Sequence, residues 1–508
     1  MSNQEKSAGL VVLVGAGPGR ADLLTLAGAR WLSLADVVVY DRLVNRALLG
    51  ACPADTEKVD VGKAPGQAGP DQRQINELLI RHARAGRCVV RLKGGDPLVF
   101  GRGAEEAEAL AEAGVAFRIV PGVTAALACA CAGIPLTDRR HASGVAFVTG
   151  HQDPAKGAGT IDWEALAGID TVVIYMGVRN LPEIVRRLIE AGRAPQSPAA
   201  IVARAGTAAQ RTVTAGLAEL PAAAESAGVN PPALIVVGDV VRLRDKIAWF
   251  ERLPLFGRTA IVTRPRQQAG QLTHRLAELG AAVVEAPAIE ILPPDDFAPV
   301  DAALGQLGEF DLVVFTSVNG VAAFASRCRR LGIDGRALAG AKVAAIGPAT
   351  ADALRDCFIR ADIMPDTYTT EALGRAILAA GRWAGKRILL ARSDIASAAL
   401  REALIEGEVG VVEDVAFYRT ARPERLPEEA LAALAAGTVD WITFTSPSAV
   451  ANFLALLPDG GGLAGVKLAA IGPVTAEALR SADLTLTVVA REHTVEGLVR
   501  AIVEASGG

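Results

Sequence analysis

The second half of the chain repeats itself, and this repeat constrains the fold more than any other feature of the sequence. The aligned pairs are FDLVVFTSVNGVAAF (310–324) with VDWITFTSPSAVANF (439–453), AKVAAIGPATADAL (341–354) with VKLAAIGPVTAEAL (466–479), IVTRP (261–265) with LLARS (389–393), and AVVEAPAIE (282–290) with GVVEDVAFY (410–418). Spacings of about 125 to 129 residues are far too long for the unit of a solenoid. The repeat therefore predicts two similar α/β lobes, with a ligand site in a cleft between them.

Strand-like apolar runs alternate with Ala-, Leu-, Glu- and Arg-rich helical stretches along the rest of the chain. In the first half these runs are VVLVG, DVVVY, CVVRL, AFRIV, VAFVTG, TVVIYM and ALIVVG. Such alternation is typical of parallel or mixed sheets that helices cover. In WFERLPLFGR (249–258) a helical stretch ends before a new strand begins, so the sequence predicts two domains, 9–250 and 255–505.

Composition excludes several classes of protein. At 508 residues, 51% of them hydrophobic, the chain is too long for one ordinary core. A net charge of -4 argues against nucleic acid or an anionic membrane as the main partner. The stretch MSNQEKSAGL has no basic region, and the apolar run after it is too short and glycine-broken for a signal or a membrane span, so we expect a cytoplasmic protein. Six cysteines without a CxxC pair and five histidines without HxxxH predict reduced thiols and no metal site.

The first strand-like run leads into a glycine loop, LVGAGPGR (13–20). Alternating glycines after a strand are one mark of a dinucleotide-binding turn. That fingerprint requires GxGxxG, whereas the spacing here is GxGxG and Arg20 occupies the place of the third glycine. Two interpretations remain open from the loop alone: a nucleotide site with Asp41 as the ribose-binding acid, and a tight turn without a ligand.

Longer motifs follow the glycine loop in a fixed order. They are YDRLV (40–44), VGK (61–63), QINELL (74–79), RLKGGDPLVFGRGAEE (91–106), VPGVTAALACACAGIPLTDR (120–139), VTGH (148–151), YMG (175–177) and PPALIVVGDVVRLRDK (231–246). Together they resemble the tetrapyrrole methylase family, and most closely the uroporphyrinogen-III C-methyltransferases, over about residues 9–250. The resemblance implies a fold of two α/β subdomains, S-adenosylmethionine as the cofactor, and a homodimer formed through this domain.

The resemblance also assigns roles to single residues. Asp41 is the implied proton acceptor and Lys63 the implied proton donor; a helix cap and a solvated loop charge are the alternatives. Arg102 and Glu105 are implied to hold or deprotonate the substrate, and a salt bridge at a helix start is the alternative. Backbone at Gly94, Gly95 and Asp96 is implied to approach the cofactor closely, where a Cβ would obstruct it.

Further residues of this half are implied to surround the ligands. The additional cofactor neighbours are Pro18, Val99, Thr124, Ala125, Met176, Ala205 and Ala233, with core packing as the alternative for Val99 and Met176. A polycarboxylate macrocycle needs cations, and the arginines in or beside the motif loops are Arg42, Arg46, Arg91, Arg102, Arg118, Arg139 and Arg140. The chain departs from the family pattern after Lys63, at Ala104 and at Arg20, which puts the local loop geometry in doubt.

Paired motifs carry the interpretation of the second half. Each IGPxT turn, at 346–350 and 471–475, follows an apolar strand and opens a helical stretch whose free N–H groups suit a carboxylate. N-capping is the alternative for the Ser and Thr residues near these turns. With VTRP, FTSVNGV and FTSPSAV, these turns make residues 255–505 resemble the uroporphyrinogen-III synthase family.

That second resemblance implies two similar flavodoxin-like lobes and a ring closure without a cofactor. Tyr418 is the side chain we expect to assist loss of the hydroxymethyl oxygen, and a half-buried aromatic is the alternative. The expected carboxylate contacts are Arg264, Ser317, Ser393, Ser446 and Thr475.

The two resemblances support one another, because the product of the second half is the substrate of the first. We expect a fused enzyme that converts hydroxymethylbilane to uroporphyrinogen III and then, by two methylations, to precorrin-2 on the route to siroheme or cobalamin. One alternative is a methyltransferase whose second half only binds tetrapyrroles as a regulatory module. A Rossmann dehydrogenase is the other.

Overall fold

The computed structural model describes residues 9–53, 55–62, 69–150, 161–458 and 461–507, with the side chains of 266–269 left out. The chain divides into two compact units, one of Met1–Ala260, His274–Val283 and Val503–Gly508 and one of Ile261–Thr273 and Val284–Ile502. The sequence-based limits of 9–250 and 255–505 stay predictions. In the part of the chain that is described, helices long and apolar enough to span a membrane are absent.

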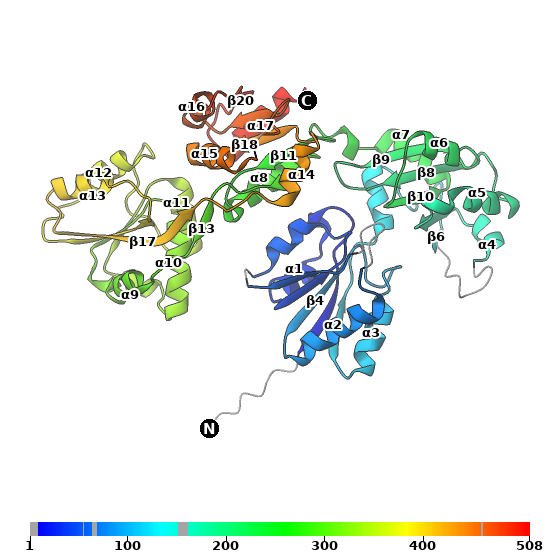
Figure 1. The fold of residues 1–508 in the computed structure, drawn as a ribbon, viewed down its shortest axis with the longest axis horizontal. Coiled ribbons are helices and arrows are strands. Elements are labelled where there is room, and N and C mark those ends of the chain that lie inside the picture. Colours follow the sequence, from blue (N-terminus) through cyan, green and yellow to red (C-terminus); the bar gives the residue numbers. More distant parts are fainter. Residues whose placement is uncertain (1–8, 54, 63–68, 151–160, 459–460, 508) are drawn as a thin grey trace. The chain divides into compact units, whose positions relative to one another are not determined.

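The chain begins with a five-stranded parallel sheet of order β3-β2-β4-β1-β5 (Figure 1). Its strands are β1 (Leu10–Gly15), β2 (Val37–Tyr40), β3 (Glu57–Asp60), β4 (Cys88–Lys93) and β5 (Ala116–Val120). Its helices, where η marks a 3-10 helix, are η1 (Ala21–Leu23), α1 (Leu26–Leu32), η2 (Arg46–Ala51), α2 (Gln72–Arg84) and α3 (Gly103–Glu112). α2 and α3 pack on one face of the sheet, while α1 and η2 pack on the other.

A second five-stranded sheet follows, of order β6-β7-β10-β8-β9. Only β6 and β7 are parallel; the other neighbours are antiparallel. The strands are β6 (Val145–Thr149), β7 (Thr171–Tyr175), β8 (Pro198–Ala203), β9 (Arg211–Gly216) and β10 (Ala233–Val237). The helices are η3 (Ala125–Ala132), α4 (Trp163–Ala167), η5 (Val178–Asn180), α5 (Leu181–Glu190), α6 (Leu220–Ser226), η6 (Asp239–Leu243), α7 (Arg244–Ile247) and η7 (Phe250–Arg252).

The second half of the chain builds two more five-stranded sheets. The first lobe has the order β12-β11-β18-β19-β20. Its strands are β11 (Thr259–Val262), β12 (Ala282–Glu285), β18 (Trp441–Phe444), β19 (Lys467–Ala470) and β20 (Val488–Val489). Its helices are α8 (Arg266–Glu278), α14 (Glu428–Ala435), α15 (Pro447–Leu456), α16 (Pro473–Ser481) and α17 (Val495–Ala505).

The second lobe has the order β13-β17-β16-β14-β15, in which β17, β16, β14 and β15 are parallel and β13 is antiparallel to β17. Its strands are β13 (Glu290–Leu292), β14 (Leu312–Phe315), β15 (Lys342–Ala345), β16 (Arg387–Ser393) and β17 (Val411–Ala421). Its helices are α9 (Ala298–Gly305), η8 (Leu307–Glu309), α10 (Val318–Leu331), η9 (Gly335–Leu338), α11 (Pro348–Asp356), α12 (Thr370–Ala379) and α13 (Ala399–Glu406).

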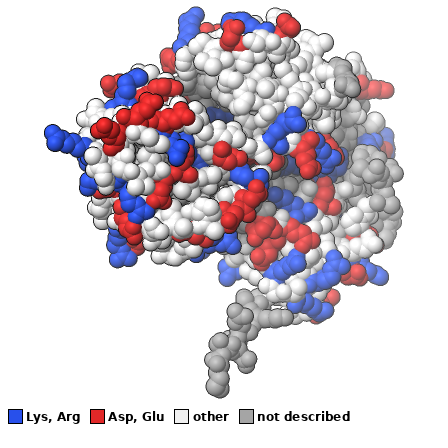
Figure 2. All heavy atoms as spheres, turned by 60° about the vertical axis from the view of Figure 1, so that its left-hand side comes forward, with Lys and Arg blue, Asp and Glu red and all other residues white. Residues whose placement is uncertain are grey.

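The predicted fold class is confirmed, including the paired lobes. The repeat aligns β11, β12, β18 and β19 with β16, β17, β14 and β15, and these strands stand in the same order in their two sheets. The first lobe has the 2-1-3-4-5 order of flavodoxin-like sheets. The second lobe adds β13 at the β17 edge. On the face shown in Figure 2, acidic and basic side chains are mixed, and neither sign forms one continuous patch there.

Candidate functional site

The motif loops of the first half meet at the carboxyl ends of parallel strands, the place where open α/β sheets bind ligands. The glycine loop follows β1 and the LKGGDP loop follows β4, and β1 and β4 are neighbours. Gly17 donates its N–H to the Gly95 carbonyl at 3.2 Å, and Gly95 donates to the Gly17 carbonyl at 3.0 Å. The two loops therefore form one backbone unit.

Close backbone packing explains the glycines of this unit. An ideal Cβ on Gly122 would lie 2.3 Å from the Gly95 carbonyl oxygen, and one on Gly15 would lie 2.5 Å from the Cα of Gly122. Gly95 itself has a φ of 72°, whereas a Cβ there would make only ordinary contacts. Gly15 and Gly122 are thus required by close packing within the chain, whereas the approach of Gly94 and Gly95 to the cofactor stays a prediction.

Asp96 organises the loop that carries it. One carboxylate oxygen accepts the N–H groups of Leu98 and Val99, at 2.8 and 3.1 Å, and the other accepts the N–H of Gly122 at 2.9 Å. Three charge-assisted hydrogen bonds of this kind fix a loop strongly. The role of Asp96 beside the cofactor stays a prediction, whereas its hydrogen bonds to the loop backbone are observed.

Several predicted cofactor neighbours lie around one core cluster of the second subdomain. Val99, Ala125 and Ala205, which are distant in the sequence, all pack against it while partly exposed. Tyr175 belongs to the cluster; its hydroxyl lies 2.7 Å from Thr124 Oγ1 and accepts the N–H of Ala126 at 3.0 Å. Burial raises the pKa of Tyr175.

The remaining predicted neighbours lie on adjoining segments. Pro18 lies between the two left-handed residues Gly17 and Gly19 of the glycine loop. Ala233 begins β10 and pairs with Ala203 at the end of β8, which leads to Ala205. An ideal Cβ on Gly19 would lie 2.9 Å from the carbonyl oxygen of Ala205, so the glycine loop packs on this segment.

Backbone strain marks the same loops. Among the described residues, the non-glycine positions with positive φ are Phe100, Arg102, Met176, Arg204, Phe358, Glu408 and Asp483. The last three follow helices, where a left-handed residue is a common terminator. The first four lie in the motif loops or beside them, and strained residues cluster at functional sites. Met176 is 53% exposed, so the core-packing alternative for Met176 is wrong.

Asp41 follows β2 and faces a buried arginine. Its carboxylate accepts a hydrogen bond from Arg91 Nη2 at 2.5 Å, while 32% of its side chain stays exposed. Asn45, not Asp41, caps the next helical segment. The helix-cap alternative for Asp41 is therefore wrong, whereas its role as proton acceptor stays a prediction.

Arg91 is not a surface cation for the macrocycle, contrary to the sequence-based expectation. It is 2% exposed and also donates from Nε to Glu106 Oε1 at 3.1 Å. Lys93 donates to the same oxygen at 2.9 Å, and burial together with Arg91 lowers the pKa of Lys93. Sequence reasoning missed Lys93 and Glu106; alternating charges within the apolar strand β4 were the available signal.

The structure describes Arg42, Arg102 and Glu105, which were also predicted to act on the substrate. Arg102 and Glu105 form a two-pronged ion pair, with distances of 2.9 and 2.7 Å, at the start of α3. This is the salt bridge that the alternative predicted, and their catalytic role stays a prediction. Arg42 is exposed beside Asp41. Lys63 lies outside the described residues.

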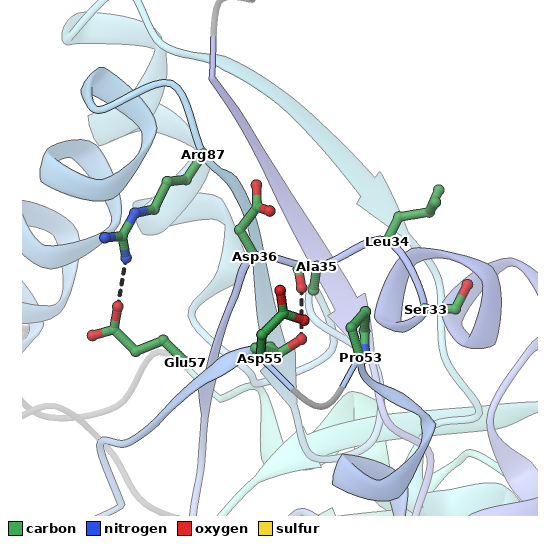
Figure 3. Close-up of a pocket in the computed structure, with 9 residues that line it drawn as sticks. Ser33, Leu34, Ala35, Asp36, Pro53, Asp55, Glu57 and Arg87 are labelled. Carbon is green, nitrogen blue, oxygen red and sulfur yellow. Dashed lines mark hydrogen bonds and ion pairs between the residues drawn. The ribbon is translucent and has the colours of Figure 1, made fainter. Parts of the chain in front are cut away.

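A pocket of about 600 Å³ lies at the amino-terminal ends of strands of the first sheet, whereas the motif loops follow the carboxyl ends (Figure 3). Asp36, Glu57 and Arg87, which line it, stand at the amino-terminal ends of β2, β3 and β4. Arg87 and Glu57 pair across it at 2.5 Å. The pocket therefore lies at the other end of these strands from Asp41, which follows β2 at its carboxyl end.

Three predicted residues of the second half come together on neighbouring strands of the second lobe: Ser317 follows β14, Ser393 ends β16 and Tyr418 lies within β17. The Tyr418 hydroxyl lies 2.9 Å from Ser317 Oγ, and Tyr418 pairs in register with Ser393. Ser317 also caps α10 by accepting the N–H of Gly320 at 3.0 Å. Capping and proximity to Tyr418 thus coexist at Ser317. Tyr418 is 7% exposed, so it is more deeply buried than expected.

For the predicted residues of the other lobe, the described contacts are with their own surroundings rather than with one another. Ser446 caps α15 by accepting the N–H of Ala449 at 3.2 Å. Thr475 is 3% exposed, like its repeat equivalent Thr350 at 4%, which is typical of a packing position rather than a carboxylate contact. Arg264 follows β11, and burial lowers its pKa. Their contacts with a substrate stay predictions.

The repeat extends further than the sequence analysis found. TTEALGRAI (369–377) aligns with TVEGLVRAI (494–502), and Thr369 and Thr494 accept the N–H groups of Ala372 and Gly497 in equivalent turns. The rings of Tyr368 and His493, each one residue earlier, lie against the glycines of the two IGPxT turns. An ideal Cβ on Gly347 would approach Tyr368 to 3.1 Å, and one on Gly472 would approach His493 to 3.2 Å.

Two protein families match the two halves of the chain. Residues 10–221 match the Tetrapyrrole (Corrin/Porphyrin) Methylases, and residues 270–500 match Uroporphyrinogen-III synthase HemD. The "Porphyrin biosynthesis protein HemD" of Ruminiclostridium josui is 36% identical over 98% of this chain and 99% of its own length.

Other relatives match about half of the chain. The siroheme synthase of Azotobacter vinelandii is 52% identical over 48% of this chain, which spans about half (53%) of that relative. A crystal structure of uroporphyrin-III C-methyl transferase from Thermus thermophilus, complexed with S-adenyl homocysteine, is 47% identical and covers 46% of this chain and 100% of its own, with a TM-score of 0.40. Since one relative matches nearly end to end and the two families match successive halves, the chain belongs to the family of proteins that fuse a tetrapyrrole methylase to a uroporphyrinogen-III synthase.

Proposed function

We propose that the chain catalyses two consecutive steps of tetrapyrrole biosynthesis. Its second half closes hydroxymethylbilane to uroporphyrinogen III, and its first half methylates that product twice to precorrin-2. The observation that best supports the proposal is the succession of the two families in one chain with a relative of the same length. Because one reaction makes the substrate of the other, the fusion joins neighbouring steps of a single route to siroheme or cobalamin.

S-adenosylmethionine is the proposed methyl donor, and it supplies an electrophilic methyl group on a sulfonium. The loops after β1, β4, β7 and β8 suit such a ligand, because their backbone has positive-φ residues. Val99 after β4, Ala125 after β5 and Ala205 after β8 add partly exposed apolar surface. Asp41, one third exposed, accepts the proton that the methylated macrocycle must lose. Exposed Arg42 beside it binds a substrate carboxylate.

In the second half, Tyr418 assists departure of the hydroxyl group from hydroxymethylbilane. Ser317 can donate the hydrogen bond between the two hydroxyls, which leaves the Tyr418 proton for the leaving oxygen. The predicted contacts Arg264, Ser393 and Ser446, with the helix N-termini of α11 and α16, hold the carboxylates of the substrate.

One observation favours a second candidate function for this half. Tyr418 is 7% exposed, and a buried hydroxyl suits a packing role as well as catalysis. A non-catalytic tetrapyrrole-binding module that regulates the methyltransferase is therefore the alternative.

The deciding experiment supplies the purified protein with fresh hydroxymethylbilane, with and without S-adenosylmethionine, and resolves the products by isomer and methylation state. We expect the type III macrocycle without the cofactor and the dimethylated product with it. If only the type I macrocycle forms while added uroporphyrinogen III is methylated, the second half is a binding module. If neither reaction occurs, the proposed function is wrong.

We also propose a cytoplasmic homodimer that forms through the first half. Phe117 and Ile119 on edge strand β5, and Val145 and Phe147 on edge strand β6, are each 36–38% exposed. Exposed apolar edge strands favour association with a second chain. Sedimentation equilibrium should give twice the chain mass, and Phe117→Lys should lower the measured mass to that of one chain.

A further inference from the structure

A buried ion network stands behind Asp41. Its members are Asp41, Arg91, Lys93 and Glu106. Arg91, Lys93 and Glu106 are 2%, 3% and 0% exposed, whereas Asp41 is 32% exposed. The network therefore reaches from the protein interior to the surface of the motif loops, and Asp41 is the member that a substrate can touch.

The topology of the first sheet brings these side chains together. Arg91 and Lys93 are two residues apart in β4 and so point to one face, the face that α2 and α3 cover. Glu106 on α3 receives both cations on Oε1, which also accepts Gln72 Nε2 from α2 at 3.0 Å. Glu106 thus ties the network to two helices.

Arg91 is held on every nitrogen of its guanidinium. Nε donates to Glu106 and Nη2 to Asp41, while Nη1 lies 3.4 Å from the carbonyl oxygens of Val39 and Leu92. A planar guanidinium fixed in this way has little freedom to rotate. The direction of its bond to Asp41 is consequently set by β2, β4 and α3.

We infer that Arg91 is a positioning residue for Asp41, and that with Glu106 it holds the Asp41 carboxylate in the orientation that accepts the substrate proton. This inference rests on the proposed methyltransferase function. Asp41 itself lies on the turn after β2, and a misplacement of about 1 Å in a catalytic group can cost about 100-fold in rate. The buried Arg91 prevents such misplacement.

A purely structural role is the competing explanation, because removing one partner from a buried ion pair destabilises a fold. The two roles differ in a double-mutant cycle on methylation of uroporphyrinogen III by the full chain. The variants are Asp41→Asn, Arg91→Lys and the combination. Lysine keeps the charge but cannot hold Asp41 and Glu106 in one plane. Arg87→Gln is the matched control, because Arg87 flanks the other end of β4 in an exposed pair.

We expect Arg91→Lys to lower kcat by about 10- to 100-fold, with the KM of both substrates within about threefold of the unsubstituted protein. The combined variant should be no slower than Asp41→Asn alone, within about twofold, because Arg91 then has nothing to position. Calorimetric binding of S-adenosylmethionine checks that each variant is folded. Arg87→Gln should keep the full rate.

Rates that multiply in the combined variant would overturn the positioning role. If Arg91→Lys does not fold, Glu106→Gln replaces it in the same cycle, since it removes the negative charge that anchors Arg91 while Gln Oε1 can still accept hydrogen bonds from Arg91 and Lys93. A wild-type chain that does not methylate, or Asp41→Asn at the wild-type rate, contradicts the proposed function instead. The two failures are therefore distinguishable.

Discussion

The hydroxyl of Tyr418 lies 2.9 Å from the hydroxyl of Ser317, although 101 residues separate them in the chain. Ser317 follows β14 and Tyr418 lies in β17, and β16 stands between these strands in the sheet. Ser393 at the end of β16 completes the row. Three polar residues that the sequence analysis named from different motifs therefore lie on or beside adjacent strands of one lobe.

This arrangement predicts how the cyclisation should respond to removal of single hydroxyls. Tyr418→Phe should lower kcat for uroporphyrinogen III formation by about 100-fold, in the range of a lost proton donor, while methylation of added uroporphyrinogen III keeps its rate. Ser317→Ala should cost less, because Tyr418 retains its own proton. A Tyr418→Phe variant that cyclises at the normal rate would contradict the assigned role and favour the binding module.

Gly122 predicts a distinct phenotype in the first half. Gly122→Ala should destabilise the first half of the chain and abolish binding of S-adenosylmethionine. The new Cβ would meet the Gly95 carbonyl oxygen at 2.3 Å and push the loop that carries Gly122 away from the LKGGDP loop. Gly50→Ala is the control, since a Cβ there meets no atom within 4 Å. Thermal unfolding and calorimetry measure the two effects, and equal behaviour of the two variants would show that the loops tolerate separation.

Sequence reasoning predicted the fold class because the apolar periodicity and the repeat can both be read directly from the sequence. The strand order of the lobes was implied by the family, and the repeat now explains it: equivalent segments occupy equivalent places in both sheets. The burial of Arg91 was not predicted. Its strand reads CVVRLK, and only the tertiary contact with Glu106 shows why a cation is stable there.

The candidate site was predicted in outline and missed in detail for the same reason. Asp41 and Asp96 follow strands within motif loops, and Tyr418 lies in the repeated segment 410–418, so the sequence patterns find all three. No motif identifies Tyr368 and His493, because each ring packs against a glycine that is distant in the sequence. Cross-chain packing of this kind has no local sequence signal.

Cys129 predicts the pH dependence of stability. Burial raises the pKa of its thiol to about 12 from an unfolded value of about 9. The folded state therefore keeps this proton while the unfolded state loses it, so stability is full below pH 9 and falls as the pH rises from 9 toward 12. At pH 10 the loss should be about 1.4 kcal/mol, one pKa unit.

The measurement for Cys129 is urea unfolding at pH 8 and pH 10 of the wild-type chain and of Cys129→Ala. Other groups titrate in the same range, but they contribute equally to both proteins. The wild-type midpoint should fall further than that of the variant. Equal shifts would mean that the thiol is not protected in the folded state.

Tyr368 and His493 predict a shared role at the two IGPxT turns. Each ring covers the glycine that begins a helix, α11 or α16, where the proposed carboxylate sites lie. Tyr368→Ala and His493→Ala should each raise the KM for hydroxymethylbilane by about tenfold with little change in kcat, since they bind substrate without taking part in the chemistry. Phe358→Ala is the control, because Phe358 is an aromatic of the lobe that carries Tyr368 and is 100% exposed. A steady-state assay of uroporphyrinogen III formation measures both constants. If all three variants behave like the wild type, the rings serve only to pack against the turns; a fall in kcat rather than a rise in KM would place them in the chemical step.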